Sequence, residues 1–256
     1  MDAIKMPLDL FELLIVVMGL GVGAFVKGVT GTGLPLVAVP VISIFLGLEH
    51  AVVAVQIPNI VSNILLIGGH RKHLTSISMR WNIVVPSVVS IIIGVLFLKT
   101  ADKITTEIFL VVILGLFLMF LGFKPNFQLK GFASRILSPV FSVVGGFTHG
   151  ATGVSGPIYG ALLYSLRLKK EEFVLYNGVI YGIFNTVQLL AFIGLGMFYF
   201  DYLIQGILAL VPVIIAQYFG MKASKLLSLL TFNRIILGLL FIIEAKLVWG
   251  IVEKWT

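Results

Sequence analysis

Two copies of a glycine-rich stretch hold the residues best suited to chemistry in this 256-residue sequence. The first is 23–35 (GAFVKGVTGTGLP), and a shift of 122 residues aligns it with 145–157 (GGFTHGATGVSGP), with six of thirteen positions identical. Glycine lets the backbone approach a ligand closely, and proline favours the first turn of a helix. Each copy is therefore predicted to present a helix N-terminus, with unpaired N–H donors and partial positive charge, to an anion.

Lys27 in the first copy, which corresponds to His149 in the second, indicates the charge of the ligand. An ammonium group inside a bilayer costs about 2.5–3.5 kcal/mol, and neither copy contains a carboxylate to neutralise it. The natural counter-ion is a substrate anion, to which His149 donates a hydrogen bond or a proton. The alternatives are that Lys27 extends to the membrane interface and that His149 is a neutral ring held by backbone carbonyls. The predicted substrate site also includes the flanking hydroxyls and glycines: Thr30, Gly31, Thr32, Gly33, Thr152, Gly153, Ser155 and Gly156.

Polar side chains in two apolar segments are predicted to face the same site. Gln56, Asn59 and Asn63 follow an i, i+3, i+7 spacing, which places them on one helical face. The second half has a similar face: Tyr181, Asn185 and Gln188. Each amide has an alternative role as a hydrogen bond between helices, typically about 1 kcal/mol. The shared register of Asn63 and Asn185, 122 residues apart, favours a place at the centre.

Composition predicts an all-α polytopic membrane protein. The chain is 59% hydrophobic and only 11% charged, with charges clustered between long apolar runs that show no strict alternation. With no cysteine, disulfides, thiolate metal sites and cysteine nucleophiles are excluded. The net charge of +7 comes from bases in short loops, so membrane topology explains it better than nucleic-acid binding. No metal or cofactor is expected.

Ten helical segments are predicted, five in each half. They cover 10–27, 34–48, 51–69, 82–99, 105–122, 132–148, 157–168, 172–195, 203–220 and 230–251. The offset of 122 becomes 126 after a four-residue slip and then matches Gly94 to Gly220, so the repeat spans nearly the whole chain. Five is odd, so the halves 1–124 and 125–256 are predicted to enter the membrane from opposite sides, as an inverted-topology repeat.

Loop charge gives an independent test of this topology. With the N-terminus outside, twelve of the eighteen basic residues fall on the cytoplasmic side, as the positive-inside rule requires. Both termini are therefore predicted to lie outside. Segments 34–48 and 157–168 are shorter than the roughly 20 residues needed to span, so each glycine-rich copy is predicted to join two partial helices near the membrane midplane.

The two motifs resemble those of the sulfite exporter TauE/SafE family. The residues that carry the resemblance are GVGAFVKGVTGTGLPLVAVP at 21–40 and GGFTHGATGVSGPIYGALL at 145–163. The resemblance implies a multi-pass protein of the prokaryotic inner or plasma membrane that transports, usually by export, sulfite or an organosulfonate such as sulfoacetate. One departure concerns the Gly-Gly pair of the family motif, which reads Gly31-Thr32-Gly33 in one copy and Ser155-Gly156 in the other.

The leading hypothesis is a secondary anion transporter in which one half rocks against the other around a midplane site. Its partners would be a small inorganic or organic sulfur anion, membrane lipids, and protons or sodium as a coupling ion; an oligomer is compatible with the sequence. One alternative is an anion channel built on the same motifs. A weaker alternative is an intramembrane enzyme using His149 or Lys27, for which no activated nucleophile or metal-ligand cluster is found.

Overall fold

The computed structural model describes residues 9–76, 78–123, 131–164, 170–224 and 229–253, and these parts of the chain consist of helices joined by short connections. The elements are α1 (Leu10–Thr30), α2 (Leu34–Leu46), α3 (Leu48–Ala54), α4 (Gln56–His70), the 3-10 helix η1 (Arg71–Ser76), α5 (Trp81–Thr100), α6 (Lys103–Phe123), α7 (Gly131–Thr152), α8 (Gly156–Tyr164), α9 (Lys170–Gly194), α10 (Phe200–Ala223) and α11 (Leu229–Glu253). The all-α prediction is confirmed for this part of the chain.

Five helical stretches are long and apolar enough to cross a membrane: Leu10–Thr30, Leu48–Thr75, Trp81–Thr100, Glu171–Gly194 and Phe200–Ala223. Large apolar side chains cover their outward faces; Met18 of α1, for example, is 68% exposed. Outward apolar faces of this extent are the signature of a lipid-facing surface rather than of a soluble fold. The chain is a multi-pass membrane protein.

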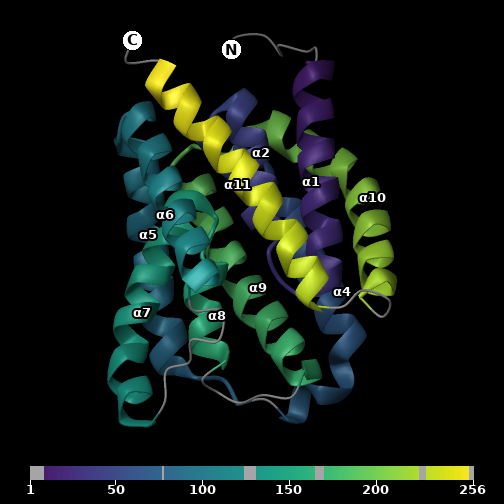
Figure 1. Ribbon diagram of the computed structural model, residues 1–256, viewed down its shortest axis with the longest axis vertical. Helices are drawn as coiled ribbons and strands as arrows, with labels where there is room; N and C mark the ends of the chain where they lie inside the picture. Colours follow the sequence, from purple (N-terminus) through teal and green to yellow (C-terminus); the bar gives the residue numbers. More distant parts are fainter. Residues whose placement is uncertain (1–8, 77, 124–130, 165–169, 225–228, 254–256) are drawn as a thin grey trace.

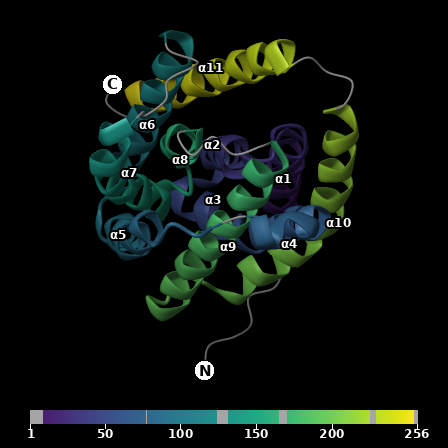
Figure 2. The same cartoon turned by 90° about the horizontal axis from the view of Figure 1, so that it is seen from below.

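Short helices occupy the middle of the bundle, and longer helices surround them. Viewed from below, α2, α3 and α8 lie inside a ring that includes α4, α5, α7, α9 and α10 (Figure 2). The first turn of α1 and the last turn of α11 lie at the same end of the molecule, whereas η1 lies at the opposite end (Figure 1). We refer to these as the terminal end and the η1 end.

Two helix pairs form the tightest contacts in the fold, α1 with α10 and α5 with α7. A Cβ atom built on Gly28 would lie 2.9 Å from Gly220 Cα, and one built on Gly94 would lie 3.0 Å from Gly150 Cα. Contacts between backbones at this range are possible only without side chains, which is why both seams are glycine on glycine. Each seam joins one helix from 1–124 to one from 125–256.

The predicted segment 51–69 corresponds to two consecutive helices, α3 and α4, within one continuous helical stretch. They meet at Val55, whose backbone keeps a helical conformation (φ −73°, ψ −17°), and we refer to this irregularity as the break at Val55. Pro58 explains it: proline has no N–H to donate to the carbonyl of Ala54, four residues earlier, and its ring crowds that carbonyl. The equivalent position in the second half is Ile180, and α9 runs without a break.

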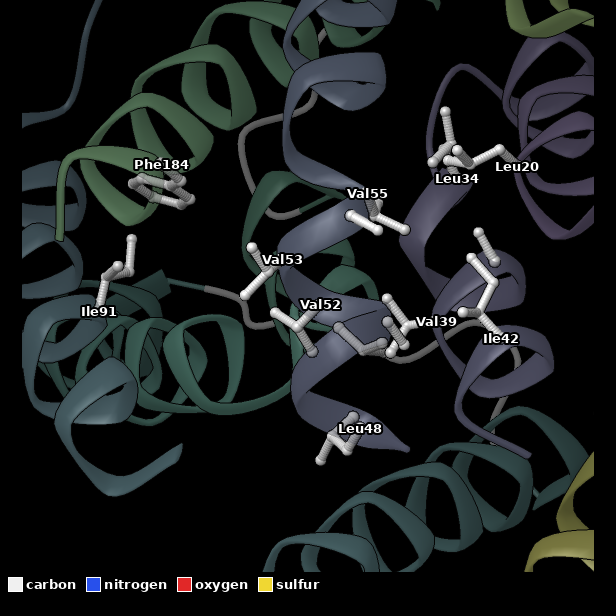
Figure 3. Packing of buried hydrophobic residues seen from close by; sticks show 14 of the residues in the cluster. Leu20, Leu34, Val39, Ile42, Leu48, Val52, Val53, Val55, Ile91 and Phe184 are labelled. Atoms are coloured by element: carbon white, nitrogen blue, oxygen red, sulfur yellow. The ribbon is translucent and has the colours of Figure 1, made fainter. Parts of the chain in front are cut away.

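The α3 helix fills the centre of the apolar core. Its residues Leu48 and Ala51–Ala54 are at most 2% exposed. Figure 3 shows Val52 and Val53 on α3 among side chains from surrounding helices, with Val39 and Ile42 on α2 to one side and Ile91 on the other. A solid apolar segment therefore lies above the breaks in α1 and α7, on the side of the terminal end.

Candidate functional site

Both glycine-rich motifs interrupt a helix and start another. Helix α1 ends at Thr30, Gly31 and Gly33 adopt left-handed conformations (φ 81° and 94°), and α2 begins at Leu34. Helix α7 ends at Thr152, Gly153 has φ 70°, and α8 begins at Gly156. Positive φ values strain any residue with a Cβ, so glycine is required at the turns.

The two threonines fix these breaks with matching hydrogen bonds. Thr30 Oγ1 donates to Val26 O (2.9 Å) and accepts from Thr32 N (3.2 Å). Thr152 Oγ1 donates to the carbonyl of Thr148 (2.8 Å) and accepts from the backbone N–H of Val154 (3.1 Å). Each hydroxyl thus satisfies backbone groups left open where the helix stops. Thr30 and Thr152 shape the site without lining its cavity.

A small cavity lies where the two breaks face each other. It leaves about 20 Å³ for the centre of a water-sized sphere, which is room for about one water. Its lining comes from both motifs and from α4 and α9: Lys27, Gly31, Thr32, Gly33, Pro35, Leu36, Asn59, Asn63, Gly153, Val154, Ser155, Gly156 and Tyr181. Ten of the sixteen residues predicted for the substrate site are in this set.

Lys27 reaches this cavity from the last turn of α1. The residue is 3% exposed, and Nζ donates to Asn59 Oδ1 (2.8 Å) and to Asn63 Oδ1 (2.5 Å) on α4. The side chain therefore points into the bundle and not towards the interface. No aspartate or glutamate of the described chain lines the cavity, and amide oxygens are the acceptors that hold the ammonium group.

Two donors at the cavity have no hydrogen-bond partner among the residues that the structure describes. Because Asn63 directs its oxygen to Lys27, its Nδ2 is left without an acceptor, although the residue is 1% exposed. The hydroxyl of Tyr181, on α9, is likewise buried without a partner. A buried polar group without a hydrogen bond costs about 1–3 kcal/mol, so both atoms indicate a ligand or water that accepts from them.

The sequence profile of the sulfite exporter TauE/SafE family matches residues 15–247, which include both motifs and every residue that lines the cavity. The chain belongs to this family. The family resemblance predicted from the motifs is thereby confirmed, and membership implies transport of a sulfur-containing anion. It is a family of membrane transporters, in agreement with the expectation that the chain is not an enzyme. No curated protein and no solved structure matched the chain.

His149 lies one layer behind the cavity in this TauE/SafE chain. Its side chain is fully buried, Nδ1 lies 3.0 Å from Ser155 Oγ, and Nε2 has no hydrogen-bond partner among the described residues. The rings of Tyr181 and Phe184 lie at tilted angles to the imidazole, with centroids 5.7 and 5.8 Å away. Since Ser155 lines the cavity and His149 does not, the imidazole adjoins the cavity through the serine hydroxyl.

Three of the predicted amides lie outside the cavity lining, and two of them hold helices together. Gln56 Nε2 donates to Gln188 Oε1 (3.1 Å), which joins α4 to α9. Gln188 Nε2 in turn donates to the carbonyls of His149 (2.8 Å) and Gly150 (3.1 Å), near the end of α7. Asn185 Nδ2 donates to Tyr181 O (2.6 Å), within α9. Gln56, Gln188 and Asn185 therefore support the site through the elements that form it.

Sequence reasoning missed the apolar part of the lining. Leu36 and Val154 complete the cavity, and Pro35 lines it in addition to starting α2. Val154 and Pro35 lie inside the motifs, and their place there was the available signal. Leu36 is one of many leucines in apolar sequence, and nothing in its pattern separates it from the core.

Proposed function

We propose that this TauE/SafE chain is a secondary transporter that exports a small sulfur-containing anion, such as sulfite or a sulfonate like sulfoacetate, across a prokaryotic inner or plasma membrane. The anion binds between the two helix breaks, and access to it alternates between the two sides. The observation that carries the proposal is that, within the described part of the chain, the cavity lining combines the Lys27 ammonium group with two donors that have no acceptor, Asn63 Nδ2 and the Tyr181 hydroxyl.

Donors from both halves of the chain meet in this cavity. Lys27 supplies an ammonium group, Asn63 an amide N–H, and Ser155 and Tyr181 hydroxyls, while no carboxylate lines the site. Hydrogen bonds that involve a charged partner are shorter and roughly twice as strong as neutral ones. An oxyanion with several acceptor oxygens satisfies these donors together, whereas a cation has no counter-charge here.

Backbone donors add to the same attraction. The N-cap of α2 is Gly33, which makes no side-chain capping bond, and residues 33, 35 and 36 all line the cavity. The first N–H groups of a helix have no partner within the helix and carry partial positive charge. The start of α8 at Gly156 faces the same cavity from the other motif. Two helix N-termini aimed at one point favour an anion there.

The glycine seams support the proposed inverted repeat. The offset of 122 takes Gly28 to Gly150, and the offset of 126 takes Gly94 to Gly220. These operations convert the α1–α10 seam into the α7–α5 seam. A pseudo-two-fold axis in the membrane plane would relate the two repeats, 1–124 and 125–256, and would make the α1–α10 contact equivalent to the α7–α5 contact. In this proposal both termini lie outside.

The packing also suggests which parts move. Helix α1 packs on α2 and α10, and α10 packs on α4; in the same way α7 packs on α8 and α5, and α5 packs on α9. We call α1, α2, α4 and α10 the first body, and α5, α7, α8 and α9 the second body. They share the cavity and meet along α4 and α9, the most extensive contact that either of these helices makes, so the proposed motion is a rocking about this contact. The glycine seams prevent the two sequence halves from moving as separate units, so the two mixed bodies replace them in the proposed rocking motion.

The narrowness of the site supports a transporter over a channel. The cavity has room for about one water, and the residues of α3 beside it are apolar and buried. A channel requires a continuous polar path, whereas alternating access requires a barrier on one side of the site. Protons or sodium as coupling ion, and an oligomeric assembly, are compatible with this scheme.

Transport by reconstituted protein tests the proposal. Proteoliposomes with the purified chain should take up sulfite with saturation and should show counterflow, because a carrier exchanges its cargo. Lys27→Met should lower sulfite uptake at least tenfold while the protein still elutes as a folded species. Lys222→Met removes an exposed lysine in the last turn of α10; it is the matched control and should transport normally.

Two results would count against the proposal. Undiminished sulfite uptake by Lys27→Met would remove the ammonium from the binding site. Uptake that rises linearly with concentration and shows no counterflow would identify a channel of the same architecture.

A further inference from the structure

A second and larger cavity lies at the terminal end of the bundle. It leaves about 380 Å³ for the centres of water-sized spheres and is a half-open hollow bordered by the ends of α2, α3, α5, α6 and α10. Its lining is rich in charged and polar side chains: Glu49, His50, Lys99, Lys103, Thr106 and Tyr202. It shares no lining residue with the cavity at the helix breaks.

Two lysines are held at this cavity without a carboxylate partner. Lys99 Nζ donates to the carbonyl of Leu195 (2.7 Å), which leaves its other N–H groups available. The side chain of Lys103 packs against Gly47, and its Nζ lies 3.6 Å from the position that a Cβ atom of residue 47 would occupy. Gly47 has φ 82° and no side chain, and both residues line the cavity. Within the described part of the chain, neither lysine forms an ion pair.

The placement of these lysines is unusual for this side of the molecule. The loops predicted to be cytoplasmic contain twelve of the eighteen basic residues. At the terminal end, the described helices contain only Lys99, Lys103 and Lys246, and two of these three line the one cavity. Lysines at the translocated side are disfavoured during insertion, so their concentration at a single hollow calls for a function.

The helices α2 and α3 both extend from the outer cavity to the transport site. Leu46, at the end of α2, and Leu48, at the start of α3, line the outer cavity, whereas Val39 and Val52 each lie 3.6 Å from the Cβ position of Gly153 at the transport site. Along α3, four residues of helix, or about 6 Å, separate Leu48 from Val52. The two sites therefore contact opposite ends of one turn of α3.

We propose that this cavity is a second, weaker oxyanion site, a vestibule that holds an anion at the terminal side of α3. The inference rests on the proposed anion transport for its physiological cargo. Lys99 and Lys103 attract the anion, and Glu49 reduces the net charge of the ionised side chains from +2 to +1. The site therefore favours small anions of low charge and binds them weakly, as a position along a transport path requires.

Calorimetric titration of sulfite into the full chain in phosphatidylcholine nanodiscs tests this site. Wild type should show a tighter and a weaker class of sites. Lys99→Gln/Lys103→Gln should weaken the second class by on the order of tenfold at low salt and leave the first unchanged. Lys99→Arg/Lys103→Arg should restore it, because charge is kept. Lys246→Gln, an exposed lysine at the same end outside the cavity, is the matched control.

The Lys27→Met variant separates this inference from the proposed transport site. It should abolish the tighter class and keep the weaker one. A single class that Lys27→Met abolishes and Lys99→Gln/Lys103→Gln leaves intact would overturn the vestibule and leave the transport proposal standing. A single class with the opposite response would retain the vestibule and overturn the transport site.

A lipid headgroup presents the same oxyanion chemistry as a free anion. Repeating the titration in nanodiscs that contain phosphatidylglycerol distinguishes the two sources. If phosphatidylglycerol removes the weaker sulfite class, the site takes the headgroup; if it does not, the site takes the free anion. Either result supports an oxyanion site. Identical titrations for Lys99→Gln/Lys103→Gln and wild type would refute it.

Discussion

An alanine in place of Gly28 would force apart the α1–α10 seam. Its Cβ would lie 2.9 Å from Gly220 Cα and 2.9 Å from Met221 N, and would also meet the carbonyl of Gln217. Real Cβ atoms essentially never approach other atoms within 3.0 Å. Because all three obstacles are backbone atoms of α10, no side-chain rotation relieves them and the two helices must separate.

The expected loss of stability follows from two opposing effects. Overpacking in a tight contact costs about 1–3 kcal/mol, and rigid backbone obstacles place Gly28→Ala at the upper end. Replacing a helical glycine by alanine returns about 0.5–1 kcal/mol. The net loss is about 2 kcal/mol, which corresponds to a fall in melting temperature of roughly 4–8 °C for a chain of this size. Gly150→Ala should behave similarly, because its Cβ would lie 3.0 Å from Gly94 Cα in the other seam.

Thermal unfolding of the purified protein in detergent, followed by tryptophan fluorescence, measures this effect. Gly21→Ala is the control, since it lies in the same helix and its Cβ would meet nothing within 4 Å. It should melt at the wild-type temperature or slightly above it. If Gly28→Ala melts as high as Gly21→Ala, the α1–α10 seam is not packed as described.

Three further predictions concern the break at Val55 between α3 and α4, the two moving bodies, and the start of α6. Pro58→Ala should supply the missing N–H to Ala54, stabilise the chain by about 1 kcal/mol and slow sulfite counterflow. The chain has no cysteine, so engineered disulfides can test the moving bodies. A Leu66→Cys/Gly178→Cys disulfide joins the two bodies at positions whose Cβ atoms would lie 3.5 Å apart, and it should stop transport until it is reduced. An Ile57→Cys/Gly206→Cys disulfide lies within the first body, with a Cβ separation of 3.2 Å, and should leave transport unchanged. Hydrogen bonds from Thr105 lower the pKa of Asp102, which precedes α6, below 3.8. These bonds therefore stabilise the folded state at neutral pH, and this contribution is lost as the pH falls from 3.8 through the lowered pKa. Asp102→Asn should remove that pH dependence from acid-unfolding curves.

Helix positions and the two breaks could be predicted because local sequence determines them. Apolar runs set the lengths of the helices. In the two motifs, the glycines favour a turn and the prolines favour the first turn of the next helix. The break at Val55 was missed although Pro58 was visible. Proline is also found inside α2, α5, α7 and α10 without ending them, so its presence alone does not locate a break.

The division of labour among the polar residues could not be predicted from spacing. Asn59, Asn63, Gln56 and Gln188 all lie on suitable helical faces, yet the first two bind Lys27 and the last two bind each other. Which of these happens depends on how α4 crosses α9 and where α1 ends beside them, and these are relations between helices. Spacing within a helix selects a face, whereas the partner on that face comes from tertiary packing.

The two bodies keep their own halves of the binding chemistry. Lys27 is bonded to Asn63 within the first body, and His149 contacts Ser155 within the second. These contacts can persist when the bodies rock, because neither crosses the α4–α9 boundary. The proposed anion would cross it, because the residues that line its cavity include Lys27 and Asn63 on one side and Ser155 and Tyr181 on the other. A ligand that contacts both bodies only when they are close shifts the equilibrium towards the closed state. The anion would thus add to the Gln56–Gln188 hydrogen bond as a link between the bodies, and the replacement of lysine by histidine between the motifs makes its two sides unequal.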